Sequence, residues 1–532
     1  MRPRRRSVLP LALALLASTA LVGSQVSAAD LNESKGFRKA VTLAGIREHQ
    51  QAFQGFADAN NGIRAAGTPG HDASAQYVHD RMAAAGYEVS FQEFTFPFVG
   101  DRTPPIFQRI TAPAATYIDG VDFGTMQYSG SGDVTAPVWA VDLLIPPGAV
   151  GTNTSGCQAA DFAGMPIGSI ALIQRGNCFF IDKANNARAA GAAAIVIFNE
   201  GQAGRTAGVF GTLGAPIFDR PVLSASFAIG DSLRNGVLSG PTGITARVKA
   251  DTVEETRTTR NVIAETPDGD PNRVVVVGAH LDSVTRGPGI NDNGSGSGTI
   301  LEIAEVYAAQ GRDSRNKLRF MWYSAEENGL IGSQFYVNSL SDAEQDQIMA
   351  MVNFDMVGSP NYVRFVYDGD NSAFPVGPGA AEGPPGSAYL EDLFIDYFNG
   401  IGLANDPTPF SGRSDYGPFI AVGIPAGGLF TGAEGIKTAA QAATYGGLAG
   451  TEYDPCYHLA CDTFAGTGSG AGATAPGLAL KGLDEMSDAA AHVVLTLSRV
   501  KVDVRQTEAV PALRTSGSLV ADSPGPEALD ER

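Results

Sequence analysis

Between residues 260 and 500 the chain alternates short apolar runs with longer amphipathic segments. The apolar runs are β-strand candidates and lie at 273–278, 318–323, 352–354 and 363–367. Apolar residues at helical spacing occur at 298–309, 329–340, 389–398 and 478–497. This alternation is typical of an α/β fold, in which helices flank both faces of a mainly parallel or mixed central sheet. We expect residues 256–502 to form such a domain.

The residues on either side of this domain have other patterns. Residues 36–90 contain two helical patterns, the second at 71–85, followed by the alternating, strand-like residues 87–94, which predict an edge strand. We expect residues 30–130 to form the N-terminal part of the same domain. Residues 131–255 consist of short β-rich runs separated by Gly, Pro and Thr, which predicts an inserted β-rich module. Residues 503–532 lack apolar periodicity and predict a disordered tail.

The N-terminus has the features of a leader. Four arginines within the first six residues precede an apolar stretch at 8–22 and the small-residue sequence VSA at 26–28. This order predicts a signal peptide over residues 1–29. The alternative is a membrane anchor, but the stretch is short and no basic stop signal follows it. We expect a secreted, extracellular protein with no membrane attachment after cleavage.

Composition and charge narrow the class of protein. With 44% hydrophobic and 17% charged residues, the 532-residue chain is too apolar for general disorder and long enough for two or more domains. Loss of the leader removes four arginines and no acidic residue, so the net charge falls from -19 to about -23. Such acidity argues against nucleic acid as a partner. A monomer is the default expectation.

The four cysteines suggest disulfides. Their positions in the sequence pair Cys157 with Cys178 and Cys456 with Cys461, and export would permit both bonds. Zinc ligation by thiolates is the alternative, but no cysteine pair has the two-residue spacing of a zinc knuckle.

The residues that follow the predicted strands are repeatedly acidic or histidine. These residues are His280 and Asp282 after the first strand, Asp292 in the next Gly-rich turn, Glu326 and Glu327 after the second strand, and Asp355 after the third. Ligands of open α/β sheets bind at the carboxyl ends of the strands. Carboxylates gathered there would repel one another unless cations compensated them. The pattern therefore predicts a metal site.

A second histidine ligand can be chosen from the remaining histidines of the mature chain, at positions 49, 71, 79, 458 and 492. His458 lies in the loop 453–462, where a short disulfide loop would hold it, whereas His71, His79 and His492 lie in helical patterns. Two histidines and three carboxylates suit two metal ions that share one bridging carboxylate. Nitrogen and oxygen donors together favour zinc over calcium or magnesium.

Six motifs, in order along this region, resemble one family. They are HLDS at 280–283, GINDNGSG at 289–296, SAEENGLIGS at 324–333, NFDM at 353–356, SGRSD at 411–415 and YH at 457–458. Together they resemble the secreted bacterial two-zinc aminopeptidases, the Streptomyces leucine aminopeptidase-like metallopeptidase family. The resemblance implies a zinc exopeptidase fold, peptide or protein N-termini as substrates, and two Zn²⁺ ions per chain; the sequence leaves additional Ca²⁺ open.

The same resemblance implies roles for individual residues. His280 and Asp355 would hold one zinc ion, Glu327 and His458 the other, and Asp292 would bridge them. It also implies Glu326 as the general base, Tyr457 as a hydrogen-bond donor to the oxyanion, Asp282 as the carboxylate that orients His280, and Arg413 as a residue near the amino end of the substrate.

The inserted module resembles a protease-associated domain. The residues that carry this resemblance are GSIALIQRGNC at 168–178 and AAGAAAIVI at 189–197. The module would limit access to the active site or serve only as structure.

We therefore expect a secreted zinc aminopeptidase that prefers leucine-like N-terminal residues. Related carboxypeptidases also have such an insertion, so a carboxypeptidase on the same scaffold is the first alternative, and Arg413 would then bind the terminal carboxylate. The second alternative is an inactive peptide-binding module, which predicts an incomplete set of ligands or a missing base.

Overall fold

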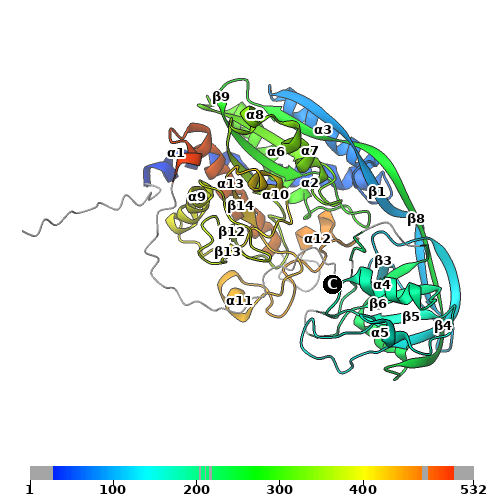
Figure 1. Ribbon diagram of the computed structural model, residues 1–532. Helices are drawn as coiled ribbons and strands as arrows, with labels where there is room; N and C mark the ends of the chain where they lie inside the picture. The colour runs from blue at the N-terminus through cyan, green and yellow to red at the C-terminus, as the bar shows by residue number, and fades with distance from the viewer. Residues whose placement is uncertain (1–27, 203–204, 210, 215–218, 470–476, 508–532) are drawn as a thin grey trace, which may run out of the picture.

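The structure is a computed structural model that describes residues 28–202, 205–209, 211–214, 219–469 and 477–507 (Figure 1). The predicted leader, apart from its last two residues, and positions 508–532 of the predicted tail lie outside the described residues. Among the described helices, none has both the length and the apolar character needed to cross a bilayer.

One mixed sheet runs through both parts of the molecule (Figure 1). In the larger part its strand order is β13-β12-β14-β11-β9-β10-β8, with β1 paired to β8. The strands β9, β10, β11 and β14 are mutually parallel, whereas β8 joins β10 antiparallel. The bounds are β1 Glu88–Arg109, β8 Gly240–Glu265, β9 Asp270–His280, β10 Asn316–Tyr323, β11 Ile348–Phe354, β12 Phe365–Tyr367, β13 Asp406–Thr408 and β14 Ala426–Phe430.

Helices cover both faces of this sheet, as predicted. Alternate valines of β9 point to opposite sides: Val275 and Val277 belong to the core cluster that includes α2, α6, α9 and α13, whereas Val274 and Val276 pack with α7 and α10. The helices are α1 Ala28–Ala40, α2 Leu43–Asp58, α3 Pro69–Ala84, α6 Gly294–Ala309, α7 Ile331–Ser339, α8 Asp342–Gln345, α9 Ser387–Gly400, α10 Tyr416–Ala421, α11 Ala439–Tyr445, α12 Phe464–Ser469 and α13 Leu478–Arg499.

Helix α6 begins four residues before the predicted start at residue 298. Asn293 caps it, because its side chain accepts a hydrogen bond from the Gly296 amide at 2.9 Å. Of the glycines that make this segment look like a loop, Gly296 is required by close packing, since a Cβ there would lie 2.0 Å from the Phe354 carbonyl oxygen. The helix therefore starts directly beside the end of β11.

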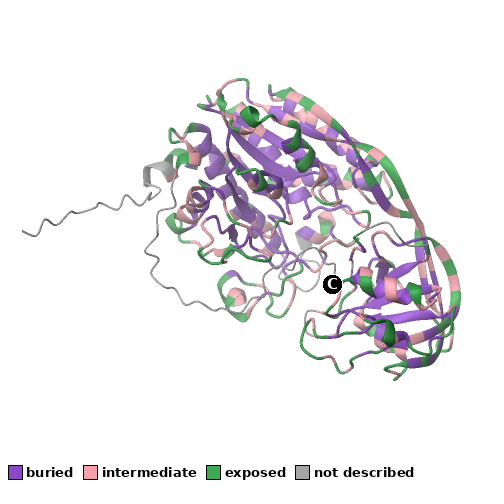
Figure 2. Cartoon of the chain, in the orientation of Figure 1, coloured by how far each residue is buried: buried purple, intermediate pink, exposed green. Residues whose placement is uncertain are grey.

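Strands β1 and β8 form a long antiparallel ribbon that joins the two parts of the molecule. Pairing runs from Glu88 opposite Glu265 to Arg109 opposite Ala246. The ends of the ribbon are buried in the two parts, whereas the middle of β8 is largely exposed (Figure 2). The insertion therefore does not begin at residue 131 or end at residue 255, because the chain crosses between the two parts within β1 and β8.

The inserted module has its own core. Phe107 and Phe123 pack there with Ile170 and Leu172, so residues before 130 that the sequence assigned to the larger domain belong to the insertion. Its sheet continues in the order β4-β5-β6-β7-β3, and the disulfide Cys157–Cys178 is present. The elements are β2 Ala115–Thr116, β3 Phe123–Thr125, β4 Gly132–Val141, η1 Ala159–Phe162, β5 Ile170–Gln174, α4 Phe180–Ala189, β6 Ala194–Phe198, β7 Val222–Ala225 and α5 Phe227–Arg234.

The beginning of the predicted tail is ordered. A short 3₁₀ helix, η2, spans Val504–Gln506, and the Val504 side chain is buried in the core of the larger domain. The predicted disordered tail therefore does not start as early as residue 503. A single buried side chain in a polar segment gives no apolar periodicity by which an ordered segment could be recognised.

Candidate active site

The strand ends bring the predicted acidic residues and His280 together. His280 is the last residue of β9, Asp355 follows β11, and Asp292 lies just before α6. His280 Nε2 lies 3.2 Å from Asp292 Oδ1 and 3.3 Å from Asp355 Oδ1. The sequence prediction that these side chains meet at one edge of the sheet is therefore met in the structure.

The second histidine lies on the other side of Asp292. His458 Nε2 is 3.2 Å from Asp292 Oδ2 and 3.1 Å from Glu327 Oε2. The disulfide Cys456–Cys461 closes the short loop that carries His458, as the cysteine positions predicted. One carboxylate, that of Asp292, thus faces both imidazoles, with a different oxygen toward each.

The chemistry of these side chains fits divalent metal ions. Glu327 Oε1 and Asp355 Oδ1 are buried and have no hydrogen-bond partner among the described residues. Donor atoms of His280, Asp292 and Glu327 all lie within 4.8 Å of one another. Buried carboxylate oxygens that accept no hydrogen bond are costly, and imidazole with carboxylate oxygen is a donor set that suits zinc. The site therefore has the groups that would hold such an ion.

The histidine pKa values reflect the same negative surroundings. Burial opposes protonation of both imidazoles, but the charges of Asp355 and Glu326 outweigh it and raise the pKa of His280 well above its ordinary value. In the same way Glu327 and Asp292 outweigh burial and raise the pKa of His458 to about 10. The site favours positive charge, which a bound cation would supply.

Glu326 differs from its neighbour Glu327. Its Oε2 lies 4.0 Å from His280 Nε2, farther than any of the ligand-like pairs. Burial is the main cause that raises the pKa of Glu326 well above its ordinary value, and nearby Asp355 and Glu327 add to it. A buried carboxyl with a raised pKa is suited to proton transfer near neutral pH.

Asp282 lies beside His280 and also contacts the turn that follows β10. His280 Nδ1 lies 3.1 Å from the backbone oxygen of Asp282 and 3.7 Å from its carboxylate. The carboxylate also accepts hydrogen bonds from the amides of Glu326 and Glu327, at 3.3 and 3.4 Å. Asp282 therefore links the end of β9 to the turn that carries both glutamates.

Arg413 lies within a hydrogen-bonded group that includes Tyr457. It donates to Glu434 Oε1 at 2.6 Å and to the Tyr457 hydroxyl at 3.1 Å. The Tyr457 ring stacks on the His458 ring with centroids 3.8 Å apart. Burial raises the pKa of the Tyr457 hydroxyl well above its ordinary value, so the hydroxyl remains a proton donor near neutral pH.

Sequence reasoning missed three supporting residues. Ser414 donates to Asp355 Oδ2 at 2.5 Å, and Asp462 accepts from the Asp292 amide at 3.0 Å. Glu434 pairs with Arg413. Ser414 and Asp462 could have been suspected, because Ser414 belongs to the motif at 411–415 and Asp462 ends the loop 453–462, but nothing in the sequence marks Glu434.

The backbone next to the site adopts a conformation that costs energy. Positive φ angles occur at Ala325 (57°), Met356 (52°) and His458 (58°). The first two are direct neighbours of predicted site residues, and the third is itself a predicted ligand. Non-glycine residues rarely adopt this left-handed region, and such residues cluster at functional sites. The turns after β10 and β11 are thus shaped to direct Glu326 and Asp355 into the site.

The site has the features of a metal-dependent hydrolase. It combines nitrogen and oxygen donors with a separate buried carboxylate, that of Glu326, at the ends of the strands. The model of peptidase family M28 matches residues 261–473, and the PA domain model matches residues 134–233. An aminopeptidase of Pseudomonas aeruginosa is 45% identical over 81% of this chain and 78% of its own length. The chain belongs to peptidase family M28 and is a metalloaminopeptidase with an inserted PA domain.

Two further proteins are similar over most of the chain. A probable leucine aminopeptidase 2 of Aspergillus fumigatus is 42% identical over 75% of this chain and 74% of its own length. The solved structure of an aminopeptidase from Aneurinibacillus sp. strain AM-1 is 28% identical, covers 87% of this chain and 95% of its own, and has a TM-score of 0.59. These similarities exclude the inactive binding module.

Proposed function

We propose that the chain is a secreted aminopeptidase that uses two zinc ions to remove leucine-like residues from peptide N-termini. The observation that carries this proposal is the position of Asp292, whose two oxygens face His280 and His458 at 3.2 Å each. A carboxylate shared by two histidines, each with its own further carboxylate, is the arrangement expected of a two-metal centre.

His280 and Asp355 would hold one zinc ion, His458 and Glu327 the other, and Asp292 would bridge them. When bound, the ions would activate a water molecule and polarise the scissile carbonyl group.

Glu326 and Tyr457 supply the proton transfers and the hydrogen bond that amide hydrolysis requires. The Glu326 carboxylate takes a proton from the attacking water as the new carbon–oxygen bond forms. It then gives this proton to the leaving nitrogen as the carbon–nitrogen bond breaks. The Tyr457 hydroxyl donates a hydrogen bond to the developing oxyanion, and Arg413, which was predicted near the amino end of the substrate, holds Tyr457 in place.

The charges of the site favour amino-end over carboxyl-end substrates. The free ammonium group of a peptide is complementary to carboxylates such as Glu326 and Asp355. The carboxypeptidase alternative requires Arg413 for a terminal carboxylate, but Arg413 is already paired with Glu434. The leucine preference is taken from relatives that are named leucine aminopeptidases.

We propose that the inserted domain limits access to the site. Arg286, in the loop between His280 and Asp292, donates to the Thr125 carbonyl oxygen of β3 at 2.6 Å. The insertion therefore contacts the loop that leads to the bridging carboxylate. Secretion is proposed from the leader sequence and is compatible with the two disulfides.

The test compares leucyl-anilide, its N-acetylated form and a peptide with a free carboxyl end, using protein collected from the culture medium. The enzyme should cleave only the free-amine substrates from the amino end, lose activity on chelation and regain it with zinc. N-terminal sequencing of the same sample should begin close to residue 30. Trimming from the carboxyl end would contradict the proposed direction, and zinc-independent cleavage would contradict the proposed metal.

A further inference from the structure

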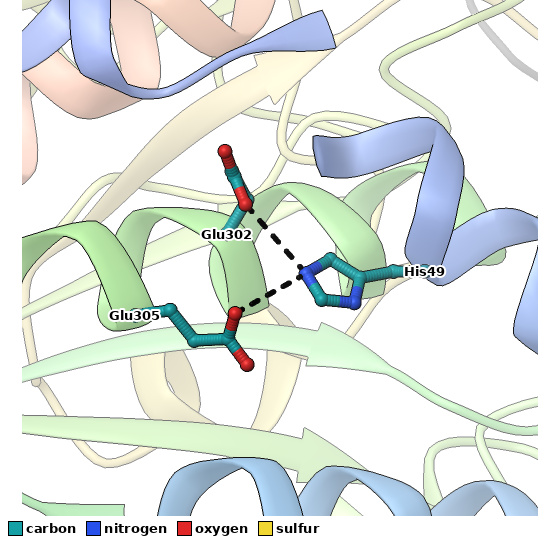
Figure 3. Close-up of side chains that lie close together, drawn as sticks. All are labelled: His49, Glu302 and Glu305. Atoms are coloured by element: carbon teal, nitrogen blue, oxygen red, sulfur yellow. Dashed lines mark ion pairs between the residues drawn. The ribbon is translucent and has the colours of Figure 1, made fainter. Parts of the chain in front are cut away.

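A second group of potential metal ligands lies between helices α2 and α6, separate from the residues of the active site. It consists of His49 on α2 and of Glu302 and Glu305 on α6, whose donor atoms lie within 4.8 Å of one another (Figure 3). His49 Nε2 lies 3.8 Å from Glu302 Oε2 and 3.9 Å from Glu305 Oε2. These distances are too long for direct hydrogen bonds.

The His49 side chain is directed into the space between the two glutamates (Figure 3). It is 1% exposed, and its Nε2 atom is buried with no hydrogen-bond partner among the described residues. The other ring nitrogen, Nδ1, lies 2.9 Å from the Tyr77 hydroxyl. When Nδ1 carries the proton and donates it to Tyr77, the lone pair of Nε2 faces the carboxylates, as in histidines that bind metals.

Both glutamates are held in place by other groups. Glu302 Oε1 accepts hydrogen bonds from the Thr42 amide at 3.1 Å and its hydroxyl at 3.3 Å. Gly45 leaves room for this carboxylate, because a Cβ there would lie 2.2 Å from Glu302 Oε1. Arg81 binds Glu305 through two nitrogens, at 2.5 and 2.6 Å. The donors are therefore positioned before any ion binds.

The charges around His49 leave a negative excess. The Arg81 guanidinium is paired with both Glu305 and Glu48, whereas the ion-pair contact of Glu302 among the described residues is with His49. A divalent cation would offset the charge of these carboxylates, and it would also give the buried His49 Nε2 a partner.

We propose that His49, Glu302 and Glu305 bind a divalent cation of the zinc class as a structural site additional to the catalytic centre. At bond lengths of about 2.1 Å and tetrahedral angles, ligand atoms are about 3.4 Å apart. The observed separations of 3.8 and 3.9 Å come within reach of this value through small side-chain rotations. Water would complete the coordination.

An ion at this position would link α2 to α6. The neighbouring residue Gln50 donates to the Ile290 carbonyl oxygen at 2.9 Å, just before the loop that carries Asp292. On α6, the Ser297 hydroxyl donates to the carbonyl oxygen of His280 at 2.5 Å. The linked helices thus support the backbone of two predicted ligands without contributing a group to the reaction.

The test counts bound zinc by mass spectrometry after the purified protein is stripped with a chelator and dialysed against buffered zinc. His49→Gln is compared with the unaltered protein and with His79→Gln, which removes a histidine that pairs with Asp80 outside the cluster. We expect His49→Gln to bind about one zinc ion fewer per chain than both. Its turnover of leucyl-anilide at saturating zinc should stay within about twofold, because it lies outside the reacting groups.

The same comparison in an Asp292→Ala background separates this site from the catalytic centre. The double variant should bind about one zinc ion fewer per chain than Asp292→Ala alone, regardless of how much zinc remains in the catalytic centre. Equal zinc content with and without His49→Gln, in both backgrounds, would overturn the proposal and leave the cluster as a buried ion-pair network. If His49→Gln does not fold, as judged by circular dichroism, Glu302→Gln replaces it with the same two outcomes.

Discussion

The neighbouring residues Glu326 and Glu327 provide a sharp test of the proposed mechanism, because one substitution applied to each should have different effects. Glutamine has nearly the same shape as glutamate but can neither accept the proton from water nor neutralise a cation. Glu327 Oε2 lies 3.1 Å from His458 Nε2, and its other oxygen is buried with no hydrogen-bond partner in the part of the chain that the structure describes. Glu326 lies 4.0 Å from His280, beyond the ligand-like distances.

Glu326→Gln should therefore retain the catalytic metal and lose turnover. A general base contributes roughly 10²- to 10⁴-fold to rate. This corresponds to about 3–5 kcal/mol in activation free energy. Glu327→Gln should lose metal content and activity together, because it removes a charged ligand. Zinc per chain and kcat for leucyl-anilide are measured on both variants and on the unaltered protein.

Two results would refute this reasoning. If Glu326→Gln kept more than about a tenth of the turnover, Glu326 would not be the base. If both variants lost zinc to the same extent, the assignment of Glu327 as a ligand and Glu326 as a free base would be wrong.

Three further predictions follow from named contacts. Asp292→Ala should lose both zinc and activity because it removes the carboxylate shared by His280 and His458, and a fully metallated variant would exclude the bridging role. Tyr457→Phe should lower kcat about 10²- to 10³-fold with zinc content unchanged, and normal kcat would exclude its contact with the oxyanion. A chain that stops after Asp503 should have a free energy of unfolding about 1.5–3 kcal/mol lower than a chain that stops after Thr507, because it lacks the buried Val504 side chain. Equal urea midpoints for the two chains would contradict this.

The fold of the larger domain and most of the candidate site could be predicted from sequence. The strands that end at the site contain apolar runs, such as the residues of β11 before Asn353, which make them easy to recognise. Their parallel arrangement brings the residues that follow them to one edge. Once His280, Asp292, Glu327 and Asp355 are assigned to that edge, their proximity follows from topology. His458 required one more argument, the short disulfide loop.

Other features could not be predicted because they depend on contacts between distant segments. Glu434 is an acid in a loop until the fold places it beside Arg413, 21 positions earlier in the chain. The glycines at the start of α6 weaken the helical pattern, yet Gly296 permits contact with β11. Nothing in the sequence marks His49 as a ligand, and only the fold brings it opposite Glu302 and Glu305.

The ends of the insertion were also hard to place from sequence, because they depend on the pairing of two strands that are distant in the chain. This pairing determines how the two domains are connected. Composition changes near residues 130 and 255, but β1 and β8 continue across both parts as a paired ribbon. The insertion is thus attached by two hydrogen-bonded strands rather than by loops. It also contacts the loop that leads to Asp292, where Arg286 bonds Thr125 and the next residue, Gly287, packs so closely on Leu459 that a Cβ would lie 2.4 Å from its carbonyl oxygen. Leu459 adjoins His458, so the loop that the insertion contacts through Arg286 also packs beside the second predicted histidine ligand.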